Sequence, residues 1–136
     1  MRIFWDTNIL IDLFSDARLN HKMTLQLLNV HIKKSHQIIL SPLSLTDTEY
    51  ILKRHHKLKD FKNRMLRLRA YVKICTVDQS QSDHALKGNW IDFEDELQYQ
   101  SALEAKCDCI ITNDKKGFKQ STIDVYSPIK FLEEHK

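Results

Sequence analysis

The feature that most constrains the fold is a regular alternation of short apolar runs with longer amphipathic segments. The apolar runs have the length of β-strands and lie at 3–5, 38–40, 72–74 and 109–111, with a weaker fifth near Val125. Strands that alternate with helices need crossover connections, which give a parallel sheet with helices on both faces. We therefore predict an α/β fold, a three-layer sandwich around a mainly parallel central sheet of four to five strands.

Segments of helical length fill the intervals between these runs. The expected helices lie after Asn20, at about 44–55, 58–68, 78–87 and 92–106, and after Pro128. The chain has 2 glycines, 2 prolines and no low-complexity tract that would indicate a linker. We expect residues 1–136 to form a single domain.

Composition and charge argue against several classes of protein. No apolar run approaches the roughly 20 residues of a membrane-spanning helix, and the first residues do not resemble a secretory signal, so we expect a cytoplasmic protein with no membrane partner. An odd number of cysteines, 3, favours a reducing compartment. Cys107 and Cys109 form a C-x-C pair like half of a zinc site, but no second pair lies at ligand spacing, and free cysteines are the alternative.

Basic residues are concentrated in one stretch, although the formal net charge is only +3. This stretch runs from 53 to 73 and includes His56 and Lys57. In the helix expected from Leu58, the basic residues lie largely off the apolar stripe. A basic helical face can contact the phosphates of RNA, and Arg64 and Arg67 are the candidates for this role. The alternative is a solvated face with no partner.

Acidic residues follow two of the expected strands. Asp6 comes directly after the run at 3–5, and Asp114 follows the run at 109–111 after Thr112 and Asn113. Functional groups of open parallel sheets gather beyond the carboxyl ends of the strands. Either aspartate could instead cap a helix or begin a turn.

Two further acids lie within expected helices. Glu49 shares a helical face with Leu45 and Leu52, so it points toward the core and must be paired, protonated or bound to a cation. Asp95 begins an apolar stripe in the helix at about 92–106, although any acid in that first turn, Asp92 included, could serve the helix dipole.

Four carboxylates at one sheet edge would repel one another unless a dication compensated them. All-oxygen ligation suits Mg²⁺ or Mn²⁺ rather than zinc, because none of the 7 histidines has a ligand spacing relative to these acids. We expect the histidines at the surface. A carboxylate-bound metal that lowers the pKa of a water would support hydrolysis of a phosphodiester bond.

Short segments in a fixed order carry a resemblance to a known family. They are Asp6-Thr7-Asn8, Glu49, Asp92-Phe93-Glu94-Asp95 with Ala102 downstream, and Ile110-Ile111-Thr112-Asn113-Asp114 followed by Phe118. With these segments nearly the whole chain resembles the PIN domain, the nuclease family that includes the VapC-type toxins of bacterial toxin–antitoxin pairs and the PilT N-terminal-like proteins.

The resemblance implies an endoribonuclease that uses Mg²⁺ or Mn²⁺ to cut RNA. It implies Asp6, Asp95 and Asp114 as metal ligands, Glu49 as a direct or water-mediated fourth, and Asn8 and Thr112 as supporting residues. It also implies a homodimer and, for a toxin, a small antitoxin protein as partner.

One departure from the family pattern concerns the end of the last segment. Relatives often carry an acid immediately before the final phenylalanine, whereas Gly117 precedes Phe118 here. A second metal site would then be weak, and Asp114 would carry more of the metal binding.

Other functions fit parts of the pattern. A phosphatase with Asp6 as nucleophile would have a second acid where Asn8 stands, and a receiver domain would need a better placed lysine than Lys115 or Lys116. A catalytically silent module that binds RNA or a protein is the main alternative. Such a module would gain no RNA affinity from clustered carboxylates that face the phosphates.

Overall fold

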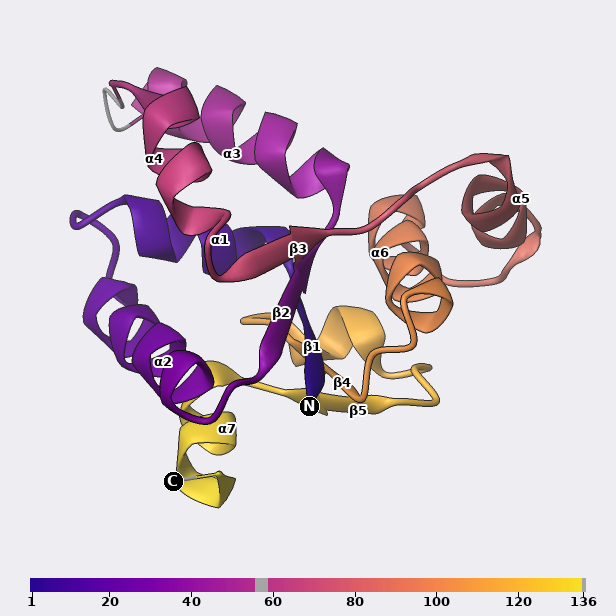
Figure 1. The fold of residues 1–136 in the computed structure, drawn as a ribbon. Helices are drawn as coiled ribbons and strands as arrows, with labels where there is room; N and C mark the ends of the chain where they lie inside the picture. The colour runs from indigo at the N-terminus through magenta and orange to yellow at the C-terminus, as the bar shows by residue number, and fades with distance from the viewer. Residues whose placement is uncertain (56–58, 136) are drawn as a thin grey trace.

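Strands and helices alternate along the chain, as the apolar pattern predicts (Figure 1). The computed structural model describes residues 1–55 and 59–135. Its strands are β1 (Arg2–Trp5), β2 (Gln37–Leu40), β3 (Val72–Ile74), β4 (Cys109–Ile111) and β5 (Asp124–Tyr126). Its helices are α1 (Thr7–Phe14), α2 (His21–Lys33), α3 (Pro42–His55), α4 (Phe61–Leu68), α5 (Gln79–Lys87), α6 (Phe93–Glu104) and α7 (Pro128–Glu134), with a 3₁₀ helix η1 (Lys115–Phe118).

The sheet is parallel throughout, with the strand order β3-β2-β1-β4-β5. In the centre, Ile3 of β1 is in register with Ile38 of β2 on one side and with Cys109 of β4 on the other. From β1 the chain winds first toward β3 and later returns to place β4 on the opposite side, so the winding direction changes between β1 and β4. Open α/β sheets bind ligands at such a switch point.

Helices cover both faces of the sheet, because alternate strand residues point in opposite directions. Ile3 and Trp5 belong to the larger core, to which α1–α4 and α7 contribute. Phe4 belongs to a second core with Tyr99 of α6 and Phe118 of η1. In Figure 1, α5 and α6 accordingly lie on the opposite side of the sheet from α1–α4. The prediction of a three-layer α/β sandwich is confirmed.

Helix α1 was not expected from the sequence pattern. Its residues from Ile9 to Phe14 are all buried, so the segment lacks the polar stripe by which an amphipathic helix is detected. Helix α4 begins at Phe61. Leu58, the expected start of the basic helix, and His56 and Lys57 of the basic stretch lie outside the described residues.

The expectation that the histidines lie at the surface is wrong for His31. This side chain is fully buried, and Trp5 Nε1 donates a hydrogen bond of 3.3 Å to its Nε2. Its Nδ1 lies 3.2 Å from Nδ1 of His36, and its ring packs against Phe131. Burial lowers the pKa of His31 to about 3. The imidazole is therefore a neutral core group.

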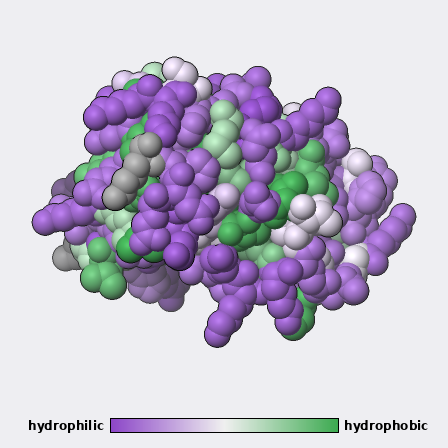
Figure 2. Space-filling view, turned by 90° about the horizontal axis from the view of Figure 1, so that it is seen from below, coloured by the Kyte–Doolittle hydropathy of each residue, from purple (hydrophilic) through white to green (hydrophobic). Residues whose placement is uncertain are grey.

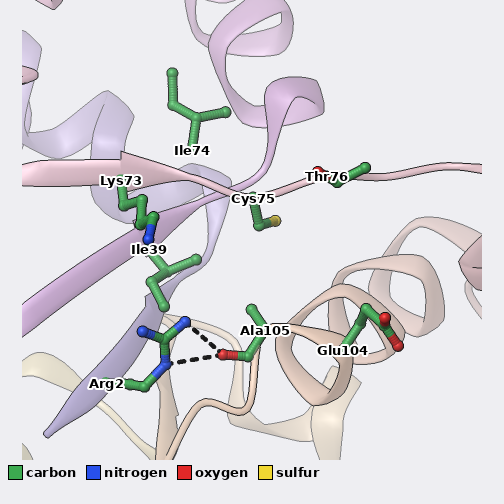
Figure 3. A pocket seen from close by; sticks show the side chains of 8 residues that line it. All are labelled: Arg2, Ile39, Lys73, Ile74, Cys75, Thr76, Glu104 and Ala105. Carbon is green, nitrogen blue, oxygen red and sulfur yellow. Dashed lines mark hydrogen bonds between the residues drawn. The ribbon is translucent and has the colours of Figure 1, made fainter.

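Arg2 ties the start of β1 to the end of α6. Its Nε and Nη2 atoms donate hydrogen bonds of 2.9 and 2.7 Å to the carbonyl oxygen of Ala105 (Figure 3). A hollow of about 290 Å³ lies beside this contact, between β3 and the end of α6, and includes Cys75. None of the predicted site residues lines it.

Hydrophilic residues cover most of the face seen in Figure 2, and hydrophobic residues are confined mainly to its central part. In the described part of the chain, no helix combines the length and the apolar character needed to cross a lipid bilayer.

Candidate functional site

Three of the predicted carboxylates meet at the carboxyl ends of β1 and β4, where the winding direction changes. An open pocket of about 230 Å³ lies there. It is lined by Asp6, Thr7, Asn8, Ile11, Ile51, Asp92, Glu94, Asp95 and Asp114. We call it the acidic pocket. Three of the four predicted acids, from three separate parts of the chain, therefore face one space.

Asp6 is the most buried acid of the pocket, with 6% of its surface exposed. Its Oδ1 accepts a hydrogen bond of 2.9 Å from the Thr7 amide, which caps α1. Its Oδ2 accepts one of 2.7 Å from Thr112 Oγ1 and one of 3.3 Å from Asn8 Nδ2. Burial raises the pKa of Asp6, while the bond from Thr112 opposes that rise. The donors fix the carboxylate in one orientation.

A buried polar cluster beneath Asp6 joins three helices. Gln98 Nε2 of α6 donates to Ser44 Oγ of α3 at 3.0 Å, to Thr7 Oγ1 of α1 at 3.2 Å and, more weakly, to Asp6 Oδ1 at 3.4 Å. Gln98 was not selected from the sequence. Its spacing of three residues from Asp95, which puts both on one helical face, is the signal that would have found it.

Asp95 faces the pocket from the first turn of α6. Burial, together with the negative charges of Asp6, Asp92, Asp114 and Glu94, raises its pKa to about 7. Asp92 has another role, because its Oδ2 accepts a hydrogen bond of 3.1 Å from the Asp95 amide and caps the helix. The cap leaves Asp95 as the better candidate for a ligand.

Asp114 begins η1 and is held through its backbone. Its amide donates a hydrogen bond of 3.0 Å to Thr112 Oγ1, so one hydroxyl connects Asp6 and Asp114. Gly117 lies against these acids. A Cβ atom at this position would come within 2.4 Å of Asp95 Oδ2 and 3.2 Å of Asp114 Oδ2. Only glycine therefore leaves both carboxylates where they are.

Glu49 is not among the residues that line the acidic pocket. It is half-buried on α3, where the fully buried positions are Ser44, Thr48 and Leu52 rather than the face predicted around Glu49. The acid that α3 brings to the cluster is Asp47. Its side chain hydrogen-bonds to Glu94. Burial raises the pKa of Glu94, and the contact with Asp47 adds to that rise.

Comparison with known proteins identifies the family. The family model described as "PIN domain" matches residues 2–116, which include every acid named above. The chain belongs to the PIN domain family. Ribonuclease VapC1 of Aquifex aeolicus (strain VF5) is 27% identical to this PIN domain over 137 residues, which cover 97% of the chain and 94% of the relative.

Solved structures share the fold of this PIN domain. The sarcin–ricin loop cleaving toxin VapC20 of Mycobacterium tuberculosis superposes with a TM-score of 0.67 at 16% identity, over 86% of this chain and 95% of that one. A toxin–antitoxin complex from Klebsiella pneumoniae gives 0.66 at 21% identity, over 94% and 98%. VapBC2 of Rickettsia felis, bound to a promoter DNA fragment, gives 0.66 at 18% identity, over 93% and 98%.

Asn8 of this PIN domain links the loops after β1 and β4. Besides contacting Asp6, it accepts a hydrogen bond of 3.2 Å from the amide of Asn113. Asn113 Nδ2 in turn donates to Asp12 Oδ2 at 2.7 Å, and Arg18 holds the other oxygen of Asp12 at 2.7 Å. The two loops that carry Asp6 and Asp114 are thereby fastened together.

The two arginines proposed to face RNA differ in their surroundings. The Arg64 guanidinium lies 4.8 Å from the ring centroid of Phe14, so a cation–π contact within the protein already occupies it. Arg67 is exposed on α4. Arg67 is the more available of the two for a phosphate.

The donor set of the acidic pocket suits a hard dication. Within residues 1–55 and 59–135, none of the pocket acids is in an ion pair with a basic side chain. The same residues hold no group of three or more His, Cys, Asp or Glu side chains already arranged as metal ligands. Asp95 is half-buried and Asp114 is exposed, so both carboxylates have room to rotate toward an ion. The residues fit a divalent metal in chemistry, and binding would draw them together.

Proposed function

We propose that this PIN domain is a metal-dependent endoribonuclease that hydrolyses RNA phosphodiester bonds at the acidic pocket. The observation that carries the proposal is the convergence of Asp6, Asp95 and Asp114 on one space without a basic partner among the described residues. Carboxylates this close repel one another when they are ionised, and a bound dication would compensate their charge. The similarity to Ribonuclease VapC1 supports RNA as the substrate.

In this proposal Asp6, Asp95 and Asp114 hold Mg²⁺ or Mn²⁺. The ion, when bound, supplies a water of lowered pKa and neutralises charge on the phosphate. Thr112 and Asn8 keep the Asp6 carboxylate oriented toward the pocket. Burial and the contact with Asp47 raise the pKa of Glu94, which also lines the pocket.

We further propose that the chain is the toxin of a toxin–antitoxin pair, acting as a homodimer in the cytoplasm. Its structural relatives include a toxin–antitoxin complex and the VapBC2 pair, which support a small antitoxin protein as partner. Arg67 on the exposed side of α4 is the residue of the basic stretch that we assign to RNA.

The test is cleavage of a mixed single-stranded RNA by the purified protein in Mn²⁺, in Mg²⁺ and in chelator. We expect cleavage that requires metal and is lost in Asp95→Asn, whereas Asp16→Asn, an exposed aspartate that does not line the pocket, stays active. Equal cleavage by the Asp95 variant would contradict the assigned site. Absence of both cleavage and metal binding would favour the silent binding module.

A further inference from the structure

A second hollow of about 300 Å³ adjoins the acidic pocket and shares Asp92, Asp95 and Asp114 with it. Beyond those acids it is lined by Trp90, Ile91, Lys116, Gly117, Lys119 and Gln120. We call it the adjoining pocket. The nuclease reaction as proposed above uses none of these six residues.

One wall of the adjoining pocket is apolar and held in place. The Trp90 ring stacks on Tyr99, with centroids 4.7 Å apart and planes at 23°, and meets Phe118 edge-on at 5.8 Å. The Trp90 amide also donates a hydrogen bond of 3.3 Å to the buried Glu96. Beside this fixed indole, Ile91 is 98% exposed. An exposed isoleucine next to an anchored aromatic ring offers apolar surface to a flat ligand.

Two basic residues also line the adjoining pocket. Lys116 and Lys119 are three residues apart in and just after η1, and both are exposed. In the described ranges neither ammonium group is in an ion pair, although the acidic pocket is next to them. The two lysines are therefore available to an anion that enters the adjoining pocket.

Gly117 lies where the two pockets meet. The space that a side chain would fill at this position lies directly against Asp95 and Asp114, and Gly117 leaves it open. Because the two pockets share Asp92, Asp95 and Asp114, one ligand can contact both.

The adjoining pocket lies beside a site for a phosphodiester and offers an apolar wall, two cations and a side-chain amide. These features match the parts of one nucleotide. We propose that the adjoining pocket binds the nucleotide next to the bond that is cut. Its base packs against Trp90 and Ile91, and its phosphate contacts Lys116 and Lys119. The volume is at the lower end of small-ligand sites, about 300–1,000 Å³, and leaves room for one base rather than several. The inference rests on the proposed function for its substrate class.

The test uses adenosine 5′-monophosphate as the probe, with the wild-type protein in chelator, so that neither metal nor cleavage contributes. The chain has two tryptophans, and Trp5 is fully buried in the larger core. We expect the probe to shift the Trp90 indole NMR signal in a saturable way while the Trp5 signal stays unchanged. Adenosine or inorganic phosphate alone should bind at least tenfold more weakly, because each lacks one of the two contacts.

Charge variants provide the control. Lys116→Gln with Lys119→Gln should weaken probe binding at least tenfold, whereas Lys33→Gln with Lys130→Gln removes the same charge from α2 and α7 and should leave binding unchanged. No response of Trp90, or equal weakening by both pairs, would overturn the inference. Metal-dependent cleavage without a Trp90 response would leave the nuclease proposal intact, and probe binding without cleavage would refute only that proposal.

Discussion

Thr112 and Asp6 are 106 residues apart in the sequence, yet Thr112 Oγ1 donates a hydrogen bond of 2.7 Å to Asp6 Oδ2. The same fully buried hydroxyl accepts the amide of Asp114 at 3.0 Å. One oxygen atom therefore connects the ends of the two central strands β1 and β4 and positions two of the candidate ligands.

Replacing Thr112 by valine keeps the shape of the side chain and removes this hydroxyl. Asp6 Oδ2 and the Asp114 amide would each lose a partner, so we expect the free energy of unfolding to fall by about 1–3 kcal/mol. The pKa of Asp6 should rise further, because the bond from Thr112 lowers it. Urea denaturation and RNA cleavage measure the two effects. Thr112→Ser, which restores the hydroxyl, should recover most of the activity, and an inactive serine variant would contradict this role.

Gly117→Ala should reduce activity far more than stability. The new Cβ would approach Asp95 Oδ2 to 2.4 Å and displace that carboxylate, which is the end of a flexible side chain. We expect cleavage to slow by about tenfold to a hundredfold, a scale typical of small misplacements in active sites, with little change in Tm. Rates and thermal unfolding measured on the same preparation test this. Full activity in the alanine variant would show that the position of Asp95 is not critical.

Asp47 and Glu49 give a direct comparison on one helix. Asp47 contacts Glu94 of the acidic pocket, whereas Glu49 is not among the residues that line the pocket. We expect Asp47→Asn to lower the cleavage rate more than Glu49→Gln. Circular dichroism of both proteins controls for folding. A larger loss with Glu49→Gln would support the position predicted from the sequence.

Asp95→Asn should stabilise the protein when no metal is bound. Burial and neighbouring acids raise the pKa of Asp95 from 3.8 to about 7, so stability is lost as the pH rises from about 3.8 to about 7 and stays reduced above that. We expect a higher Tm for the variant than for the wild type at pH 8 in chelator. Addition of Mn²⁺ should raise the Tm of the wild type more than that of the variant. An equal response of both proteins to Mn²⁺ would exclude Asp95 as a ligand.

We expect the free energy of unfolding to fall in acid because of His31. Its folded-state pKa of about 3 is below the ordinary histidine value of 6.5, so the unfolded chain binds a proton first as the pH falls. The stabilisation is present above about pH 6.5 and is lost toward pH 3, by about 1.4 kcal/mol per pH unit. The difference in unfolding free energy between wild type and His31→Gln across this range measures it. The His84→Gln variant, at an exposed position of α5, controls for the loss of a histidine as such.

The sequence alone was enough to predict the parallel sheet and to select three of the acids that line the acidic pocket. Short apolar runs between amphipathic segments are a local pattern, and the parallel α/β sandwich follows from it. Asp6 and Asp114 could be selected because they follow strands, whose carboxyl ends meet at one edge whatever the details of packing. Asp95 could be selected from its place at the start of a helical stripe.

Only the tertiary structure decided which side of each helix faces the acidic pocket. Glu49 and Asp47 are two residues apart on α3, and the contacts of Ser44 with Thr7 and Gln98 set the rotation of that helix. Helix α1 has no polar stripe because it is buried on every side, and His31 is neutral because Trp5 and Phe131 enclose it. The Arg64 guanidinium makes its cation–π contact with Phe14, which lies far from it in the sequence. Each outcome depends on contacts between segments distant in sequence, which no local pattern records.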